Sequence, residues 1–259
     1  MVLVMNEYQL AEDILNGLPH GCSLGESMVL LAKYYKKNGG NKRSVSAKLK
    51  KYALEHNATA TETAISASVE YAVKQAWKYD IVMIEKIDVS VQEMSRIGAL
   101  KSVQARKLAF TLLCIAKYWD EVSSVAEHWI NSPDSYIVSS ACITSSTKRQ
   151  DELFKELYDA GMIDYAKRVD NLHVRVLFME SGETAVSIRD LRNLGYQYLA
   201  LSGDSQWFLC ENCGVTVRKA KSDFGRPQKY CKACAEEVNR IKTIARMKTL
   251  REGCKILPV

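Results

Sequence analysis

The sequence predicts a mainly α-helical protein that ends in a small module built around four cysteines. Three observations predict this class. Apolar residues recur at helical spacing through most of the chain. Two Cys-x-x-Cys pairs, which begin at Cys210 and Cys231, lie near the C-terminus. Lys and Arg are concentrated in the same region.

Helical periodicity is clearest in the first half of the chain. In the segment 24–37, Leu24, Met28 and Leu31 follow one another at intervals of four and three residues, which places them on one helix face. The segment 103–119 is the most apolar helix and is expected at the centre of the core. Further helices are predicted at 44–57, 59–79 and 85–97.

Polar residues indicate where three of these helices begin. Ser23 directly precedes the first apolar position of one helix and is expected to cap its N-terminus. Thr59 with Glu62, and Ser90 with Glu93, have the spacing of a capping box, in which two residues satisfy each other's free N–H groups.

The middle of the chain predicts a winged helix-turn-helix. The segment 147–161 has helical spacing, and two short strands follow it, one through Ile163 and one at 173–179. A helix followed by a two-stranded ribbon is the order in which a winged helix ends. The helix 103–119 and the short segment 135–142 would supply its first two helices.

The two cysteine pairs predict a metal site. Cys210, Cys213, Cys231 and Cys234 form two Cys-x-x-Cys motifs separated by seventeen residues, a gap that suits a structural four-cysteine zinc site. Buried or redox cysteines would not require both pairs and this gap together. Four protein ligands leave no position for a catalytic water, so one structural Zn²⁺ is expected. The residues between the pairs are expected to form a hairpin, with Gly214 in the first turn.

The excess positive charge is local. The chain has 36 Lys and Arg against 30 Asp and Glu, and the stretch from 210 to 255 contains twelve against five. The rest of the chain is close to neutral, so the tail is expected to meet an anion such as a phosphate backbone. The alternative is a charged, solubilising surface. The candidate nucleic-acid contacts here are Arg218, Lys219, Lys221, Arg226, Lys229, Arg240, Lys242, Arg246 and Lys248.

A second candidate contact lies at the start of the helix 147–161. Recognition helices place their N-terminal residues in the major groove, and Lys148, Arg149 and Gln150 can meet base edges or phosphates there. The alternatives are a solvated helix cap and a winged helix that binds protein.

The sequence contains no motif typical of catalysis. The four histidines, at positions 20, 56, 128 and 173, are scattered, and no Gly-rich phosphate-binding motif occurs. Cys22 lacks the preceding strand that a nucleophile elbow needs. The protein is therefore expected not to be an enzyme. The acidic N-terminus does not resemble a signal peptide and no apolar run would span a bilayer, so a cytoplasmic location is expected.

Three motifs carry a resemblance to a known group. The stretches LYDAGMIDYAKRVDNLHVRVLF, IRDLRNLGYQYL and CENCG…GRPQKYCKACAEEVNRIKTIARMKTLRE resemble poorly characterised bacteriophage and mobile-element proteins that end in a zinc-ribbon-like module with four cysteines and a basic tail. The resemblance covers about Leu157 to Glu252. It implies a phage or mobile-element setting, with Cys210, Cys213, Cys231 and Cys234 as zinc ligands, and implies no particular activity.

These observations predict four regions and a function. The regions are a helical N-terminal domain (1–100), a winged-helix-like domain (101–182), a strand–helix connector (183–205) and the four-cysteine module with its basic tail (206–259). The expected function is non-catalytic binding of nucleic acid, DNA rather than RNA, in regulation or replication. The alternative is a phage protein that binds and inhibits a host defence factor such as a nuclease. The sequence does not indicate an oligomeric state.

Overall fold

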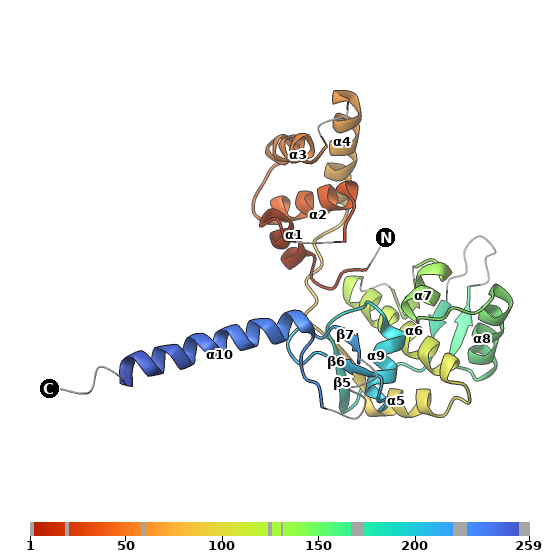
Figure 1. Ribbon diagram of the computed structural model, residues 1–259. Helices are drawn as coiled ribbons and strands as arrows, with labels where there is room; N and C mark the ends of the chain where they lie inside the picture. The colour runs from red at the N-terminus through yellow and green to blue at the C-terminus, as the bar shows by residue number, and fades with distance from the viewer. Residues whose placement is uncertain are drawn as a thin grey trace. The chain divides into compact units, whose positions relative to one another are not determined.

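The computed structural model describes residues 3–18, 21–57, 61–123, 126–130, 132–166, 174–219 and 227–253, with side chains as far as Met247. In these residues the chain is mainly helical, as predicted, and it divides into two compact units between Glu85 and Lys86 (Figure 1). The division precedes the boundary expected at residue 100, because a strand and a helix within 87–98 pack in the second unit. No helix in the described ranges is both long and apolar enough to cross a membrane.

In its described residues, the first unit consists of four helices around a core of their own. Met28 and Leu31, which were expected on the inner face of the second of these helices, are 1% and 0% exposed. The core takes apolar side chains from all four helices. The helices are α1 (Glu7–Leu15), α2 (Leu24–Lys37), α3 (Lys42–His56) and α4 (Glu62–Lys78).

A buried ion pair fastens the first unit together. The ammonium of Lys33 on α2 donates to both carboxylate oxygens of Glu7 on α1 at 2.8 Å. The same carboxylate accepts the N–H of Val82, in the segment after α4, at 2.9 Å. Removing one partner would leave a buried charge without compensation, so this contact holds three segments in place.

The second unit contains three small antiparallel sheets and, in its described residues, six helices. The helices are α5 (Val91–Gly98), α6 (Val103–Val122), α7 (Asp134–Ser140), α8 (Thr147–Asp159), α9 (Leu194–Leu201) and α10 (Lys232–Gly253). The strands are β1 (Ile87–Ser90), β2 (Trp129–Ile130), β3 (Ile163–Tyr165), β4 (Val174–Val176), β5 (Thr184–Ile188), β6 (Trp207–Leu209) and β7 (Thr216–Arg218). The sheets pair β1 with β5, β2 with β4 and β3, and β6 with β7.

The predicted capping residues are confirmed at two helices and wrong at a third. Ser23 caps α2 and Ser90 caps α5, each in a complete capping box with a Glu three residues further on. At α4 the cap is Thr61, and Thr59 lies outside the described residues. The Thr61 hydroxyl directly precedes the helix and accepts the N–H of Ala64.

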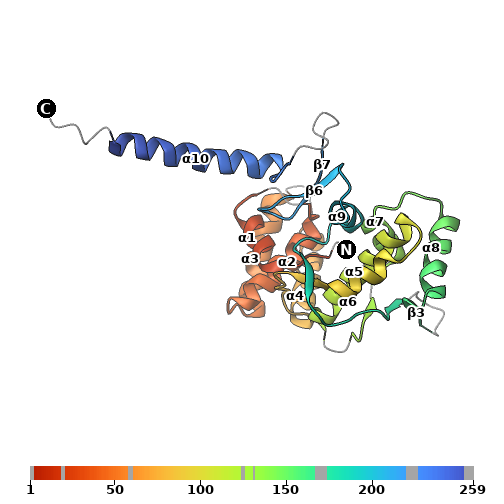
Figure 2. The same ribbon diagram turned by 90° about the horizontal axis from the view of Figure 1, so that it is seen from below.

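Helix α6 forms the centre of the second unit, as its apolar sequence predicted. Phe110, Leu112 and Leu113 are fully buried, and α7 and α8 pack beside the helix (Figure 2). Along the chain the order is α6, β2, α7, α8, β3 and β4, and the three strands form one sheet with β4 in the middle. The sequence predicted all of these elements except β2, which is too short to show a periodicity.

A buried carboxylate joins α5, α6 and the segment before β5. Glu93 is 0% exposed and accepts a hydrogen bond from the ammonium of Lys117 at 2.8 Å. It also accepts the backbone N–H groups of Ser90 at 2.7 Å and Glu180 at 3.0 Å. The charge is therefore compensated by a cation and by two N–H donors, which is what a buried carboxylate requires.

Helix α9 packs very closely against the end of α7. A Cβ added at Gly195 would lie 1.9 Å from the carbonyl oxygen of Ala141, so only glycine fits there. Gln197 is 1% exposed and donates to two carbonyl oxygens of the preceding loop. Tyr198 is buried with its ring centroid 5.7 Å from that of Phe110 on α6. The motif DLRNLGYQYL therefore attaches α9 to the core of the second unit.

Replacing Gly195 with Ala is expected to lower the free energy of unfolding by about 2–3 kcal/mol, because the new methyl group would overlap a backbone oxygen. Urea unfolding followed by tryptophan fluorescence would measure the change.

The matched control is Gly98→Ala at the end of α5, where nothing lies within 4 Å of the added Cβ. That change is expected to be neutral or slightly stabilising. Equal stability of the two variants would contradict the close packing of α9.

Candidate metal centre

The first cysteine pair lies in the turn of the β6–β7 hairpin. The Cys210 N–H donates to the Val215 carbonyl at 3.0 Å, and the Gly214 N–H donates to the Cys210 carbonyl at 2.9 Å. Gly214 has φ +71°, a conformation that favours glycine, as its predicted place in the turn requires. The expectation of a hairpin between the two pairs is corrected, because the hairpin encloses the first pair.

The second pair lies at the N-terminus of α10. Cys231 directly precedes the helix and Cys234 is in its first turn, where the Cys234 N–H lies 3.5 Å from the Cys231 sulfur. The backbone N–H of Glu211 donates to the carbonyl of Lys229 at 2.8 Å, which holds the two pairs together. Free N–H groups at a helix N-terminus favour thiolates.

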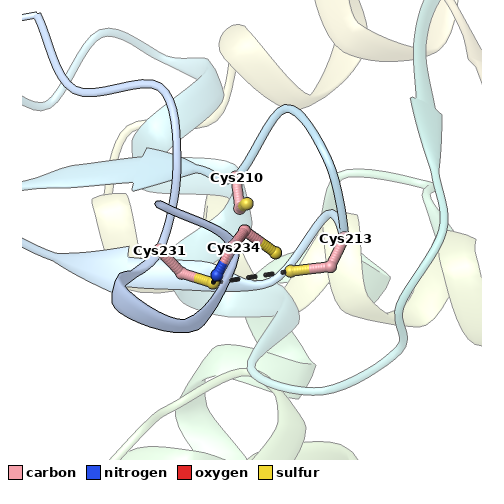
Figure 3. A group of neighbouring side chains, drawn as sticks. All are labelled: Cys210, Cys213, Cys231 and Cys234. Carbon is pink, nitrogen blue, oxygen red and sulfur yellow. Dashed lines mark hydrogen bonds between the residues drawn. The ribbon is translucent and has the colours of Figure 1, made fainter. Parts of the chain in front are cut away.

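The four sulfur atoms meet in one small volume. All four lie within 4.8 Å of one another and point toward a common centre (Figure 3). The sulfurs of Cys213 and Cys231 are 3.8 Å apart. A tetrahedral zinc ion with Zn–S bonds of about 2.3 Å has S···S edges of about 3.8 Å, whereas a disulfide needs about 2 Å. The predicted ligand set can therefore hold one metal ion, and zinc is the ion that these ligands suit.

The thiols need a cation to be charged together. Burial would raise the pKa of Cys210, but hydrogen bonds from backbone N–H groups, those of Cys213 and Cys231 first among them, outweigh it and lower that pKa to about 6. At Cys213, burial and the neighbouring sulfurs raise the pKa to about 12. The first thiol therefore ionises easily, whereas ionisation of a second thiol beside it is unfavourable. A divalent ion would supply the positive charge that four neighbouring thiolates require.

Stacked aromatic rings attach the hairpin to the rest of the second unit. The rings of Trp207 on β6 and Tyr196 on α9 have centroids 3.9 Å apart and an interplanar angle of 11°. The guanidinium of Arg218, which is paired with Trp207 across the hairpin, lies over the Trp207 ring, 5.9 Å from its centroid. The hairpin and its two cysteines are thereby held against α9, which is itself fixed to the core.

Most of the predicted cationic residues of this region are exposed, and several have local partners. Arg218 contacts Gln206, Lys229 pairs with Glu211 and Arg240 pairs with Glu237. Lys219 donates its N–H to the Gln206 carbonyl. Lys242 and Arg246 are exposed on α10. Lys221, Arg226 and the side chain of Lys248 lie outside the described residues.

The predicted contacts on α8 lie at its N-terminus, as expected, but two of the three side chains have internal partners. Lys148 is exposed. Arg149 forms an ion pair with Glu152 at 3.0 Å, and the Gln150 amide donates to the Ser145 carbonyl at 2.7 Å. The helix contains three Lys and Arg against four Asp and Glu, so its charge does not favour a polyanion.

Two arginines beside the cluster were missed by sequence reasoning. The Cβ of Arg189 lies 3.4 Å from the position of a Cβ at Gly214. The pKa of the Arg192 guanidinium is raised, mainly by its hydrogen bond to Asp190. The Cys213 thiolate also contributes, so Arg192 lies near the cluster. Their distance from the cysteines along the chain gave no signal of this proximity.

No family model, curated protein or solved structure matches this chain.

Replacing Cys231 with Ser is expected to abolish stoichiometric zinc binding, because three thiolates would remain in a site whose sulfurs come from both segments. Elemental analysis of the purified full-length protein would count the metal. Wild type is expected to hold one zinc ion per chain.

The control is Cys22→Ser, which removes a thiol from the first unit and should leave the metal content unchanged. Equal zinc in both variants, or no zinc in the wild type, would contradict the assignment.

Proposed function

We propose that the protein binds nucleic acid without catalysing a reaction, through a cationic surface that a structural zinc ion organises. The supporting observation is the position of the cysteine cluster at the N-terminus of α10. A closed tetrathiolate would fix the direction in which this basic helix leaves the module. Double-stranded DNA is the preferred ligand.

The charges of α10 support binding through phosphates. Arg240, Lys242 and Arg246 are exposed, and Lys242 and Arg246 are four residues apart on one helix face. Of these three residues, Arg240 alone forms an ion pair with a carboxylate in the part of the chain that the structure describes, and that pair is exposed. A surface ion pair of this kind contributes little, so the pair would exchange readily for a phosphate contact.

Arginines near the metal centre extend the same surface. Arg189 and Arg192 are exposed on the loop that leads into α9, and Arg218 is exposed at the end of β7. Such contacts position a protein on the backbone of a duplex and carry no sequence information. We therefore propose strongly salt-dependent binding with weak dependence on sequence.

The α6–β4 region supports a winged helix as the finer description of this fold. Its helices and strands follow in the order that the sequence suggested, with α8 in the place of a recognition helix. The negative balance of charge on α8 makes it the weaker of the two proposed contacts. In this proposal α10 supplies most of the affinity.

Replacing Lys242 and Arg246 together with Glu is expected to weaken binding to a labelled duplex of mixed sequence at least tenfold. It is also expected to lower the slope of log affinity against log salt by about 2, since each lost phosphate contact removes about 0.9. Fluorescence anisotropy at several salt concentrations measures both quantities.

The comparison variant is Lys148→Glu with Arg149→Glu on α8, which makes the same change in net charge and is expected to weaken binding less. Binding that does not vary with salt would refute the proposal. Capture of a protein from cell extract that survives nuclease treatment, with no affinity for DNA, would favour the inhibitor of a host factor instead.

A further inference from the structure

The first unit concentrates its positive charge on one helix. Residues 1–85 contain ten Lys and Arg and nine Asp and Glu, and α3 alone carries five of the bases and one of the acids. Of the five Lys elsewhere in this unit, Lys33 and Lys36 pair with carboxylates. On α3 the one ion pair among the described residues joins Lys51 and Glu55 at 3.9 Å, with both side chains exposed. The helix therefore presents net positive charge.

A short glycine turn joins α2 to α3. Gly39 has φ +83°, and a Cβ at Gly40 would lie 2.7 Å from the Tyr35 carbonyl oxygen, so both positions require glycine. Asn41 then caps α3 by accepting the N–H of Ser44 at 2.9 Å. Two helices joined by about four residues that include glycine are typical of a helix-turn-helix. In Figure 1 the axis of α2 lies in the plane of the page, whereas α3 is seen nearly end-on. The two helices therefore cross at a large angle.

The outer face of α3 has the composition of a DNA-contacting helix. Val45, Leu49 and Tyr52 are buried against the core, which leaves the opposite face to solvent. The exposed residues of that face are Arg43, Ala47, Lys50, Lys51 and Leu54. Arg and Lys contact guanine and phosphate in the major groove, and small apolar side chains contact the thymine methyl group.

A hollow beside this face is lined by further cations and hydroxyls, which are groups able to contact phosphate. Its volume is about 380 Å³, and it lies between α3 and α4. Two cations and two hydroxyls line it, together with one carboxylate and two valines. These residues are Lys42, Ser46, Lys50, Ser66, Glu70, Val69 and Val73. Lys50 belongs both to the hollow and to the exposed face, so the two are continuous.

We infer that α2 and α3 form a helix-turn-helix and that α3 enters the major groove of double-stranded DNA. The protein then has a second DNA contact in the first unit, separate from the zinc-organised surface of the second. This inference extends the proposed function and does not depend on it, because α3 lies in another unit and its charge is independent of the metal.

The test replaces Arg43 and Lys50 with Glu in the full-length protein. Binding to a labelled mixed-sequence duplex of about two helical turns (about 21 bp) is measured by anisotropy across a salt series. The expected result is at least tenfold weaker binding and a salt slope lower by about 2. A second variant, Arg43→Gln with Lys50→Gln, removes the charge without adding carboxylates and is expected to weaken binding in the same direction.

The matched control is Lys74→Glu with Lys78→Glu, an equal change in charge at exposed positions of α4. It is expected to change affinity less than about threefold, because neither lysine lines the hollow or lies on the exposed face of α3. Equal losses in the α3 and α4 variants would overturn the inference, since net charge alone would then explain them. Circular dichroism of all variants checks that the helices are retained.

Double-stranded RNA of the same sequence separates groove insertion from simple charge attraction. The major groove of A-form RNA is too narrow for a helix, so RNA is expected to bind more weakly than DNA and to be less affected by the α3 variant. Equal loss for DNA and RNA would overturn the inference. If Lys242→Glu with Arg246→Glu weakens binding and the α3 variant does not, the inference fails and the proposed function stands.

Discussion

The convergence of four thiols is the constraint on which the C-terminal part of the structure depends. Sulfur atoms within 4.8 Å of one another cannot all be charged without a cation, and two of them belong to a hairpin while two belong to the start of a helix. A bound divalent ion would compensate the negative charge and hold the hairpin and the start of the helix rigidly together. Helix α10 would then have a defined starting direction.

The metal centre can fix the start of α10 only because the hairpin is itself attached to the core of the second unit. The Trp207–Tyr196 stack holds β6 against α9, and the close approach of Gly195 to Ala141 holds α9 against the end of α7. Each step has a different physical basis, namely ring stacking and backbone contact without an intervening side chain. The chain of contacts runs from the metal centre to the buried helix α6 without leaving the second unit.

The exposed helices α3 and α10 each carry several cations without strong partners. Buried or half-buried cations have defined roles, as Lys33 has with Glu7 and Lys117 with Glu93. Those on α3 and α10 are exposed and weakly paired, a pattern that contributes little to stability. Because the two helices belong to different units, each surface would, in the proposed function, contribute phosphate contacts independently of the other.

Local sequence was sufficient for features that depend on neighbours along the chain. Apolar spacing predicted α2, α6 and α8, the Ser90–Glu93 spacing predicted one capping box, Ser23 was predicted as a helix cap, and two Cys-x-x-Cys motifs predicted the ligand set. Each of these is decided within a few residues, by helical geometry or by the reach of one turn.

The tertiary structure alone decided what depends on distant segments. The pairing of β1 with β5 moves the boundary between units to Glu85, because a strand of a few residues is stable only beside its partner. Only folding brings Arg189 beside the cysteine cluster and pairs Lys117 with Glu93. Spacing along the chain therefore determined the helices and the four-cysteine cluster, whereas packing determined which cations are left exposed.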